Sequence, residues 1–172
     1  MHPGKKLRKA LAGKGLVTAP GVYDMMSARI ADGLGFSALY MTGFGVSATL
    51  GLPDAGLASY TEMVARVQQI AGGTKTAVIA DGDTGYGGLL NVDFTVRGYE
   101  AAGAQAIQIE DQEFPKKCGH TPGRRVVPLA DAVNRTRWRH RRAPPGISSS
   151  LRARTRARRS DWMKRCAAAR LS

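Results

Sequence analysis

The chain has 172 residues and a formal net charge of +13, from 26 lysines and arginines against 13 aspartates and glutamates. The charge is unevenly placed: residues 1–134 hold 13 basic and 12 acidic residues, a net of +1, whereas residues 135–172 hold 13 basic residues and only Asp161, a net of +12. A chain-wide nucleic-acid-binding surface is therefore not indicated, and residues 1–134 have the composition of an ordinary globular domain with one core.

Several classes of protein are excluded by the sequence pattern. No apolar run approaches the roughly 18 to 20 residues of a membrane-spanning helix, and no apolar segment follows the charged start as it would in a signal peptide. The two cysteines, Cys118 and Cys166, lie in segments of opposite character, so a disulfide framework is not expected. We expect a cytoplasmic protein with reduced thiols and no membrane partner.

Short apolar runs alternate with helix-like stretches along residues 1–134, which is typical of βαβ units and a parallel sheet. The expected strands are residues 16–19, 37–41, 76–80 and 105–109. The expected helices are residues 5–13, 25–34, 60–71 and 92–102, with Ser59, Thr61 and Asn91 as candidate caps. The predicted fold class is α/β.

Polar side chains follow three of the expected strands. Thr42 follows the second, Asp81 and Asp83 follow the third, and Glu110 and Asp111 follow the fourth. Since the carboxyl ends of parallel strands are where α/β folds build their sites, we expect these side chains to share one edge.

Asp81 and Asp83 leave an apolar run and enter the glycine-rich segment ADGDTGYG. Two carboxylates in this position supply the hard oxygen ligands that Mg²⁺ prefers. The spacing also suits a plain turn in which aspartate and glycine serve only the backbone geometry. Both interpretations stay open on the residues alone.

A cysteine lies in a basic setting in the run KKCGH, where Lys116 and Lys117 precede Cys118 and His120 follows it. Nearby positive charge favours the thiolate, which would make Cys118 a usable acid, base or nucleophile. A structural cysteine in a solvated basic loop is the alternative, because Cys-x-His is too short to specify a site.

The segment YMTGFGV forms a third candidate, which we interpret as a glycine-rich loop. Backbone amides around Gly43, together with the Thr42 hydroxyl, could bind a carboxylate or phosphate oxygen. The segment does not fit the dinucleotide or phosphate-loop fingerprints.

Taken in order, the motifs YMTGFGVSATLGLPDAG, ADGDTGYG, IEDQ and KKCGH resemble the isocitrate lyase and phosphoenolpyruvate mutase superfamily. The resemblance runs through residues 5–134. The KKCGH run is similar to that of its lyases, which include isocitrate, methylisocitrate and dimethylmalate lyases, although carboxyphosphonoenolpyruvate mutase also carries it.

The resemblance implies a TIM-type (β/α)₈ barrel, of which about the first four βα units are present, and a Mg²⁺ cofactor with Mn²⁺ as an alternative. It implies that Asp81 and Asp83 are metal ligands, with Glu110 reaching the metal through water. The remaining implied roles are substrate binding by Thr42, Gly43, Phe44, Gly119 and His120, and catalysis by Cys118 and Asp54. Phe44 stands where many members have a small residue, which leaves substrate size open.

The activity implied by the resemblance is Mg²⁺-dependent carbon–carbon cleavage of a small-molecule carboxylic acid such as methylisocitrate or isocitrate, giving pyruvate or glyoxylate plus a dicarboxylate. Mutase-type phosphorus–carbon chemistry and oxaloacetate decarboxylation are the alternatives. An intact member would be a homo-oligomer, commonly a tetramer. We expect this shortened chain to have doubtful activity.

The basic segment 135–172 lacks the strand ending in ARTDA and the helix reading LDEAL that the resemblance leads one to expect next. The codons for Asp161-Trp-Met-Lys164 necessarily read Leu-Asp-Glu in a shifted frame. We therefore interpret residues 135–172 as an out-of-frame, disordered segment that follows a one-base frameshift near residue 135. The alternative is an arginine-rich nucleic-acid-binding arm, and even a non-biological segment of this charge would bind nucleic acid non-specifically.

Overall fold

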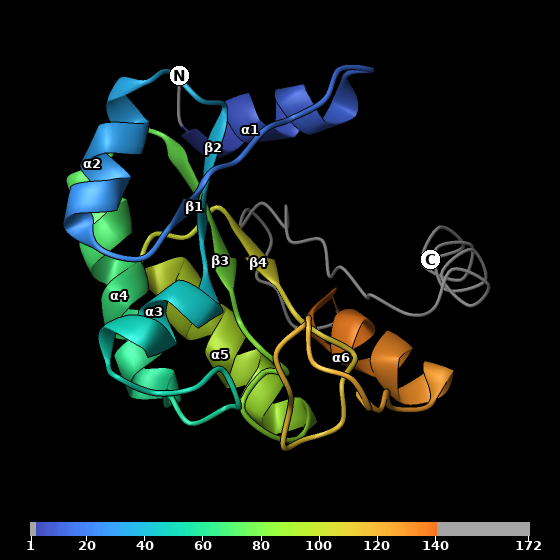
Figure 1. Cartoon of the computed structure of the whole chain (residues 1–172). Helices are drawn as coiled ribbons and strands as arrows, with labels where there is room; N and C mark the ends of the chain where they lie inside the picture. The colour runs from blue at the N-terminus through green and yellow to red at the C-terminus, as the bar shows by residue number, and fades with distance from the viewer. Residues whose placement is uncertain (1–2, 141–172) are drawn as a thin grey trace.

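Four parallel strands pair in chain order, β1-β2-β3-β4, and helices connect them (Figure 1). The computed structural model describes residues 3–140. The strands are β1 (Gly21–Val22), β2 (Ala38–Met41), β3 (Ala77–Asp81) and β4 (Ala106–Gln108). The helices are α1 (Pro3–Ala12), α2 (Met25–Gly33), α3 (Gly43–Thr49), α4 (Tyr60–Gly73), α5 (Leu89–Ala101) and α6 (Leu129–His140).

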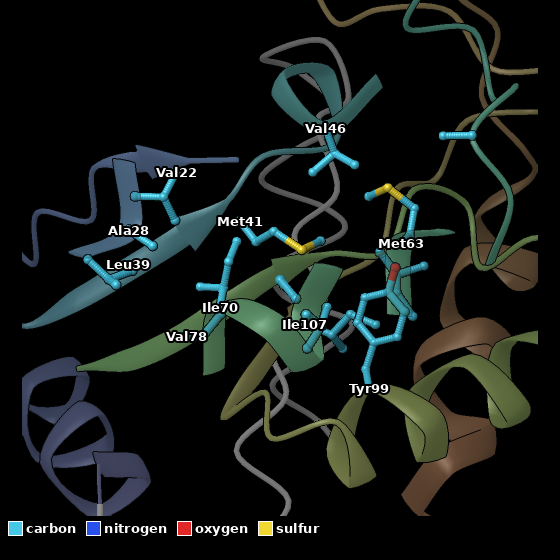
Figure 2. Close-up of a cluster of buried hydrophobic side chains, with 14 of the residues drawn as sticks. Val22, Ala28, Leu39, Met41, Val46, Met63, Ile70, Val78, Tyr99 and Ile107 are labelled. Carbon is cyan, nitrogen blue, oxygen red and sulfur yellow. The ribbon is translucent and has the colours of Figure 1, made fainter. Parts of the chain in front are cut away.

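The sheet has two different faces because successive strand residues point to opposite sides. One face, with Leu39, Val78 and Ile107, packs against α2, α4 and α5 and forms the main core (Figure 2). The other face is lined near its amino-terminal end by Ala38, Ala77 and Ala106, which Leu7 of α1 covers. The small alanines let α1 lie close to this end of the sheet.

Three of the four predicted strands and all four predicted helices are confirmed, with ends shifted by up to three residues. The predicted strand at residues 16–19 is wrong, because the first strand is β1 at Gly21–Val22. Pairing with β2 begins only at Pro20, whose carbonyl accepts a 2.9 Å hydrogen bond from the Tyr40 amide. Upstream of it Leu16 is 94% exposed, and Val17 and Ala19 pack against the second core cluster without pairing as a strand.

Two helices were not predicted. Helix α3 occupies the segment that we interpreted as a glycine-rich loop, and its two glycines disguise its helical character. Helix α6 crosses residue 134, where we placed the start of the basic segment, and continues to His140. The Arg135 guanidinium donates to the carbonyls of Glu110 and Gln112 at 3.2 and 3.1 Å, which attaches this helix to the loop after β4. The rest of the predicted disordered segment, residues 141–172, lies outside the described residues.

Helix α2 presents an apolar stripe to solvent. Met26, Ile30 and Leu34 follow one another at intervals of four residues and are 76%, 66% and 69% exposed. In a closed eight-stranded barrel each helix is flanked on both sides, whereas the helix that packs most against α2 within residues 3–140 is α4 (Figure 1). None of the helices in the described residues is long and apolar enough to cross a membrane.

Replacing Ile30 and Leu34 together by glutamine should reduce concentration-dependent self-association of this chain, because an exposed apolar stripe favours association. Light scattering over a dilution series measures the effect, and circular dichroism should show an unchanged helix content. Leu16→Gln is the control, since Leu16 is exposed but does not belong to α2. Equal association of the double variant and the control would contradict the prediction.

Asp32 connects the end of α2 to the start of β3. Its carboxylate accepts hydrogen bonds from the amides of Lys75 and Thr76, the shortest at 2.8 Å. Partial burial raises the pKa of Asp32, but these hydrogen bonds, led by Thr76, outweigh it and hold the pKa below its ordinary value. The contribution to stability is therefore present above the unfolded-state pKa of about 3.9 and is lost as the pH falls through the lower folded-state pKa.

The variant Asp32→Asn should lower the free energy of unfolding by about 1–2 kcal/mol at pH 7, and by less at pH 3. The difference in unfolding free energy between the two proteins becomes smaller at pH 3 because Asp32 of the parent protein is protonated at low pH. Urea unfolding of both proteins at the two pH values measures it. A difference that stays constant with pH would show that the charge of Asp32 is not what stabilises the junction.

Candidate active site at the carboxyl ends of the strands

Gly43 and Asp81 meet where β2 and β3 end. The Gly43 amide donates a 3.1 Å hydrogen bond to Asp81 Oδ2, and a Cβ atom at position 43 would lie 3.0 Å from that oxygen. A side chain at position 43 would therefore press tightly against the Asp81 carboxylate, and glycine relieves this contact. Thr42 caps α3, its Oγ1 accepting from the Gly45 amide at 3.4 Å, which fixes the start of this helix beside Asp81.

The loop after β3 folds back onto its own first carboxylate. Asp81 Oδ1 accepts from the Asp83 amide at 3.0 Å, and Asp83 has a positive φ of 47°. The Asp83 carbonyl in turn accepts from the Glu110 amide at 2.7 Å, and the Gly82 amide donates to Gln108 at 2.8 Å. The ends of β3 and β4 are thereby connected, and both aspartates are less than 10% exposed.

Lys116 lies between two carboxylates that are distant in sequence. Its ammonium group is 2.5 Å from Asp83 Oδ1 and also forms an ion pair with Asp54 Oδ1, and its side chain is only 4% exposed. Among the described residues, no donor makes a well-directed hydrogen bond to Asp83 Oδ1. Its contact with Lys116 is therefore an ion pair without hydrogen-bond geometry. The buried oxygen therefore keeps lone-pair capacity that a cation could use.

Burial and mutual repulsion perturb these groups. Burial, followed by the charge of Asp81, raises the pKa of Asp83 to about 6, although Lys116 acts in the opposite direction. The same two causes raise the pKa of Glu110 above its ordinary value. Burial lowers the pKa of Lys116, but the charge of Asp83 and the contact with Asp54 outweigh it and raise that pKa. The site therefore concentrates negative charge that needs a cation.

The donor set fits Mg²⁺. The ion prefers oxygen ligands and is commonly held by one or two carboxylates, keeping several waters. Asp81 and Asp83 are adjacent at the strand end, and Asp83 Oδ1 lacks a directed donor. Glu110 does not complete a three-ligand cluster: within residues 3–140 no three histidine, cysteine or acidic side chains converge in this way. The expectation that Glu110 contacts a metal through water stays a prediction.

The cysteine loop is attached to Glu110 by Gln112. The Gln112 amide nitrogen donates to Glu110 Oε2 at 2.7 Å and to the Lys117 carbonyl at 2.9 Å, while its oxygen accepts from the Lys117 amide. Cys118 is partly exposed, and its Sγ lies 3.8 Å from His120 Nδ1. The thiol therefore borders solvent, where a substrate could reach it.

The structure corrects one expectation about this loop. The Lys116 side chain is not solvent-exposed beside Cys118 as a basic loop would suggest. It points into the protein and forms ion pairs with Asp83 and Asp54. Gly119 stays beside the thiol in the chain and is partly buried, whereas Phe44 on α3 is 60% exposed. The structure thus forms one buried cluster from Asp54, Asp83 and Lys116, with Asp81 and Gly43 beside it, and one accessible pair from Cys118 and His120.

Sequence reasoning missed Lys116 and Gln112 as members of the site. Only their spacing from predicted site residues could have identified them: Gln112 follows Glu110 by two residues, and Lys116 precedes Cys118 by two. Residue type gave no further help, since lysine and glutamine at a loop are usually solvated.

A model of the phosphoenolpyruvate phosphomutase family matches residues 7–169. A 2,3-dimethylmalate lyase of Eubacterium barkeri is 50% identical over 136 residues, which are 78% of this chain and 47% of that protein. The chain belongs to the phosphoenolpyruvate mutase/isocitrate lyase superfamily, a group of TIM-barrel enzymes that contains carbon–carbon lyases and mutases. It spans about half the length of the curated relatives it matches.

Two solved structures give the same architecture. Oxaloacetate acetylhydrolase with the inhibitor 3,3-difluorooxalacetate superposes with a TM-score of 0.90 at 38% identity, covering 98% of this chain and 60% of that one. Phosphonopyruvate hydrolase, solved with oxalate and Mg²⁺, gives 0.86 at 30% identity, covering 99% of this chain and 60% of that one. The expected family and fold class are confirmed.

Replacing Lys116 by glutamine should destabilise the protein by about 3 kcal/mol at pH 8, because Asp83 and Asp54 then lose the cation that compensates their buried charge. The loss should be smaller at pH 5, since a carboxyl whose pKa is raised to about 6 becomes neutral there. Urea unfolding at both pH values measures the change. Lys117→Gln is the control, because Lys117 is exposed and its backbone alone contacts Gln112. An equal loss in both variants would contradict the prediction.

Proposed function

We propose that the complete protein is a Mg²⁺-dependent carbon–carbon lyase acting on a 2-hydroxy acid with a carboxylate at position 3, such as methylisocitrate or isocitrate. One observation carries the proposal. A cluster of buried carboxylates that could bind a cation lies at the same edge of the sheet as the accessible Cys118 and His120 side chains. The 2,3-dimethylmalate lyase relative supports cleavage of this chemical kind.

Asp81 and Asp83 would hold the Mg²⁺, with Mn²⁺ as an alternative, and Glu110 would contact it through water. When bound, the ion would supply Lewis-acid stabilisation of negative charge on a 2-oxo acid product. Thr42, Gly43 and Phe44 begin α3 beside Asp81 and would bind the carboxylate end of that acid. Lys116 would keep Asp54 and Asp83 in place and limit repulsion among the carboxylates.

Cys118 would act as the general acid. As the carbon–carbon bond breaks, the 2-hydroxyl gives its proton to water and becomes the carbonyl of the 2-oxo acid, and the electron pair of the broken bond stays on the carbon that carries the departing dicarboxylate. The Cys118 S–H proton transfers to that carbon, and the thiolate left behind takes a proton back from solvent. His120, 3.8 Å from the sulfur, would orient the thiol, and Gly119 leaves the approach to it open. The products are pyruvate or glyoxylate and a dicarboxylate.

Mutase chemistry is the second candidate, and the position of Asp54 favours it. In the mutases that the sequence resembles, the corresponding loop supplies a catalytic aspartate, and here Asp54 forms an ion pair with Lys116 beside Asp83. Product analysis separates the two, because cleavage releases a 2-oxo acid whereas a mutase moves a phosphorus group within one molecule. Oxaloacetate decarboxylation would instead release carbon dioxide.

The variant Cys118→Ser should lower the rate of 2-oxo acid release at least about a hundredfold, because serine is a far weaker proton donor. Its affinity for Mn²⁺ should be unchanged, since Cys118 is not among the proposed ligands. A coupled dehydrogenase assay with methylisocitrate, isocitrate and dimethylmalate measures release, and Lys117→Gln, at an exposed position of the same loop, is the control. Undiminished release by Cys118→Ser would remove the cysteine from the mechanism.

We also propose that residues 135–172 are read out of frame. The DNA sequence across codons 125–175 and beyond tests this directly. A frame that one base restores into further family-like sequence would support it, and the repaired protein, expected to be a homo-oligomer, would then be the one to assay. An intact frame would refute it and would favour a nucleic-acid-binding arm, for which sequence-selective binding is the test.

A further inference from the structure

Helix α5 contacts the metal-binding loop through a buried hydroxyl. Tyr99 is 1% exposed, and its hydroxyl donates a 3.2 Å hydrogen bond to the carbonyl oxygen of Asp81. The Tyr86 hydroxyl lies 2.9 Å from that of Tyr99. Because a phenol carries one proton and that of Tyr99 is donated to Asp81, Tyr86 must donate to Tyr99. The chain of hydrogen bonds therefore runs in one direction, from Tyr86 to the Asp81 backbone.

The same helix holds the loop at two more points. Thr95 Oγ1 donates to the Gly85 carbonyl at 3.3 Å, and Asn91 Oδ1 accepts from the Gly88 amide at 3.1 Å. Tyr99 rises from α5 at the margin of the main core, near Met63 (Figure 2). Both ends of the loop are thus attached to one helix that is itself fixed by the core.

The loop needs such attachment because its backbone is strained. Asp83 and Tyr86 have φ values of 47° and 58°, a region that residues other than glycine rarely adopt. Strained backbone persists only where the surrounding structure holds it. The positive φ of Asp83 also sets the direction of a carboxylate that we assign to the metal.

We propose that Tyr99 is a positioning residue of the metal site, whose hydroxyl, supported by Tyr86, holds the backbone at Asp81 so that the carboxylates of Asp81 and Asp83 are preorganised for the cation. The proposal rests on the proposed function for its assignment of the two ligands. The Tyr99 hydroxyl bonds the backbone carbonyl of Asp81 and the Tyr86 hydroxyl, so its effect on the carboxylates would pass through the backbone of the loop.

The test uses Tyr99→Phe in the 172-residue chain, which removes the hydroxyl and keeps the ring. Mn²⁺ affinity is measured by the electron paramagnetic resonance of the free ion, and hydrogen exchange is measured at the amides of Asp83 and Gly85 without metal. Tyr60→Phe is the matched control: its ring is 6.4 Å from that of Tyr99 in the same aromatic cluster, and removing its hydroxyl breaks no hydrogen bond that the described loop makes. Circular dichroism checks that each variant folds.

We expect Tyr99→Phe to weaken Mn²⁺ binding by about five- to tenfold, the worth of about one hydrogen bond, and to accelerate exchange at both amides. Tyr86→Phe should give a smaller effect, and Tyr60→Phe should give none. If the parent protein binds Mn²⁺ and Tyr99→Phe binds it equally well, or if Tyr60→Phe weakens binding as much, the positioning role is refuted and the proposed function stands.

Failure of the parent protein to bind Mn²⁺ or Mg²⁺ would instead refute the metal assignment in the proposed function. The exchange rates then decide the role of Tyr99 alone. Faster exchange in Tyr99→Phe than in Tyr60→Phe would show that the hydroxyl holds the loop, and equal rates would show that it does not.

Discussion

Negative charge is concentrated and buried where β3 ends, and the surrounding structure is arranged to tolerate it. Asp81 and Asp83 are almost inaccessible to water, so each charge must be met by a donor or a cation inside the protein. Backbone amides of Gly43 and Asp83 meet Asp81, and Lys116 meets Asp83. The net excess of carboxylates that remains is what makes the edge suitable for a divalent ion.

This requirement explains several features that lie apart in sequence. Glycine suits position 43 because a Cβ atom there would press tightly against the Asp81 carboxylate. The Lys116 side chain points inward from the loop after β4. The Gln112 side chain holds that loop in place through hydrogen bonds to Glu110 and to the backbone of Lys117. The accessible thiol of Cys118 then lies at the end of a segment that the buried charges have already fixed.

The helices contribute more than a covering for the sheet. Helix α5 packs its apolar side into the main core and directs Tyr99, Thr95 and Asn91 at the loop after β3. The core thereby holds a strained loop in one conformation. Elsewhere the core leaves surface uncovered, as along Met26, Ile30 and Leu34 of α2, because four βα units cannot flank every helix as a closed barrel does.

The sequence alone determined the βα alternation, the cap at Ser59, the family and the residue types at the strand ends, because these depend on local pattern and on motif order. It could not place β1, since the choice between residues 16–19 and Gly21–Val22 depends on pairing with Tyr40 and Met41. Nor could it show that α3 replaces a loop or that Lys116 faces Asp54 across 62 residues of chain. Those outcomes depend on burial and on charges brought together by the folded chain, which only the tertiary structure decides.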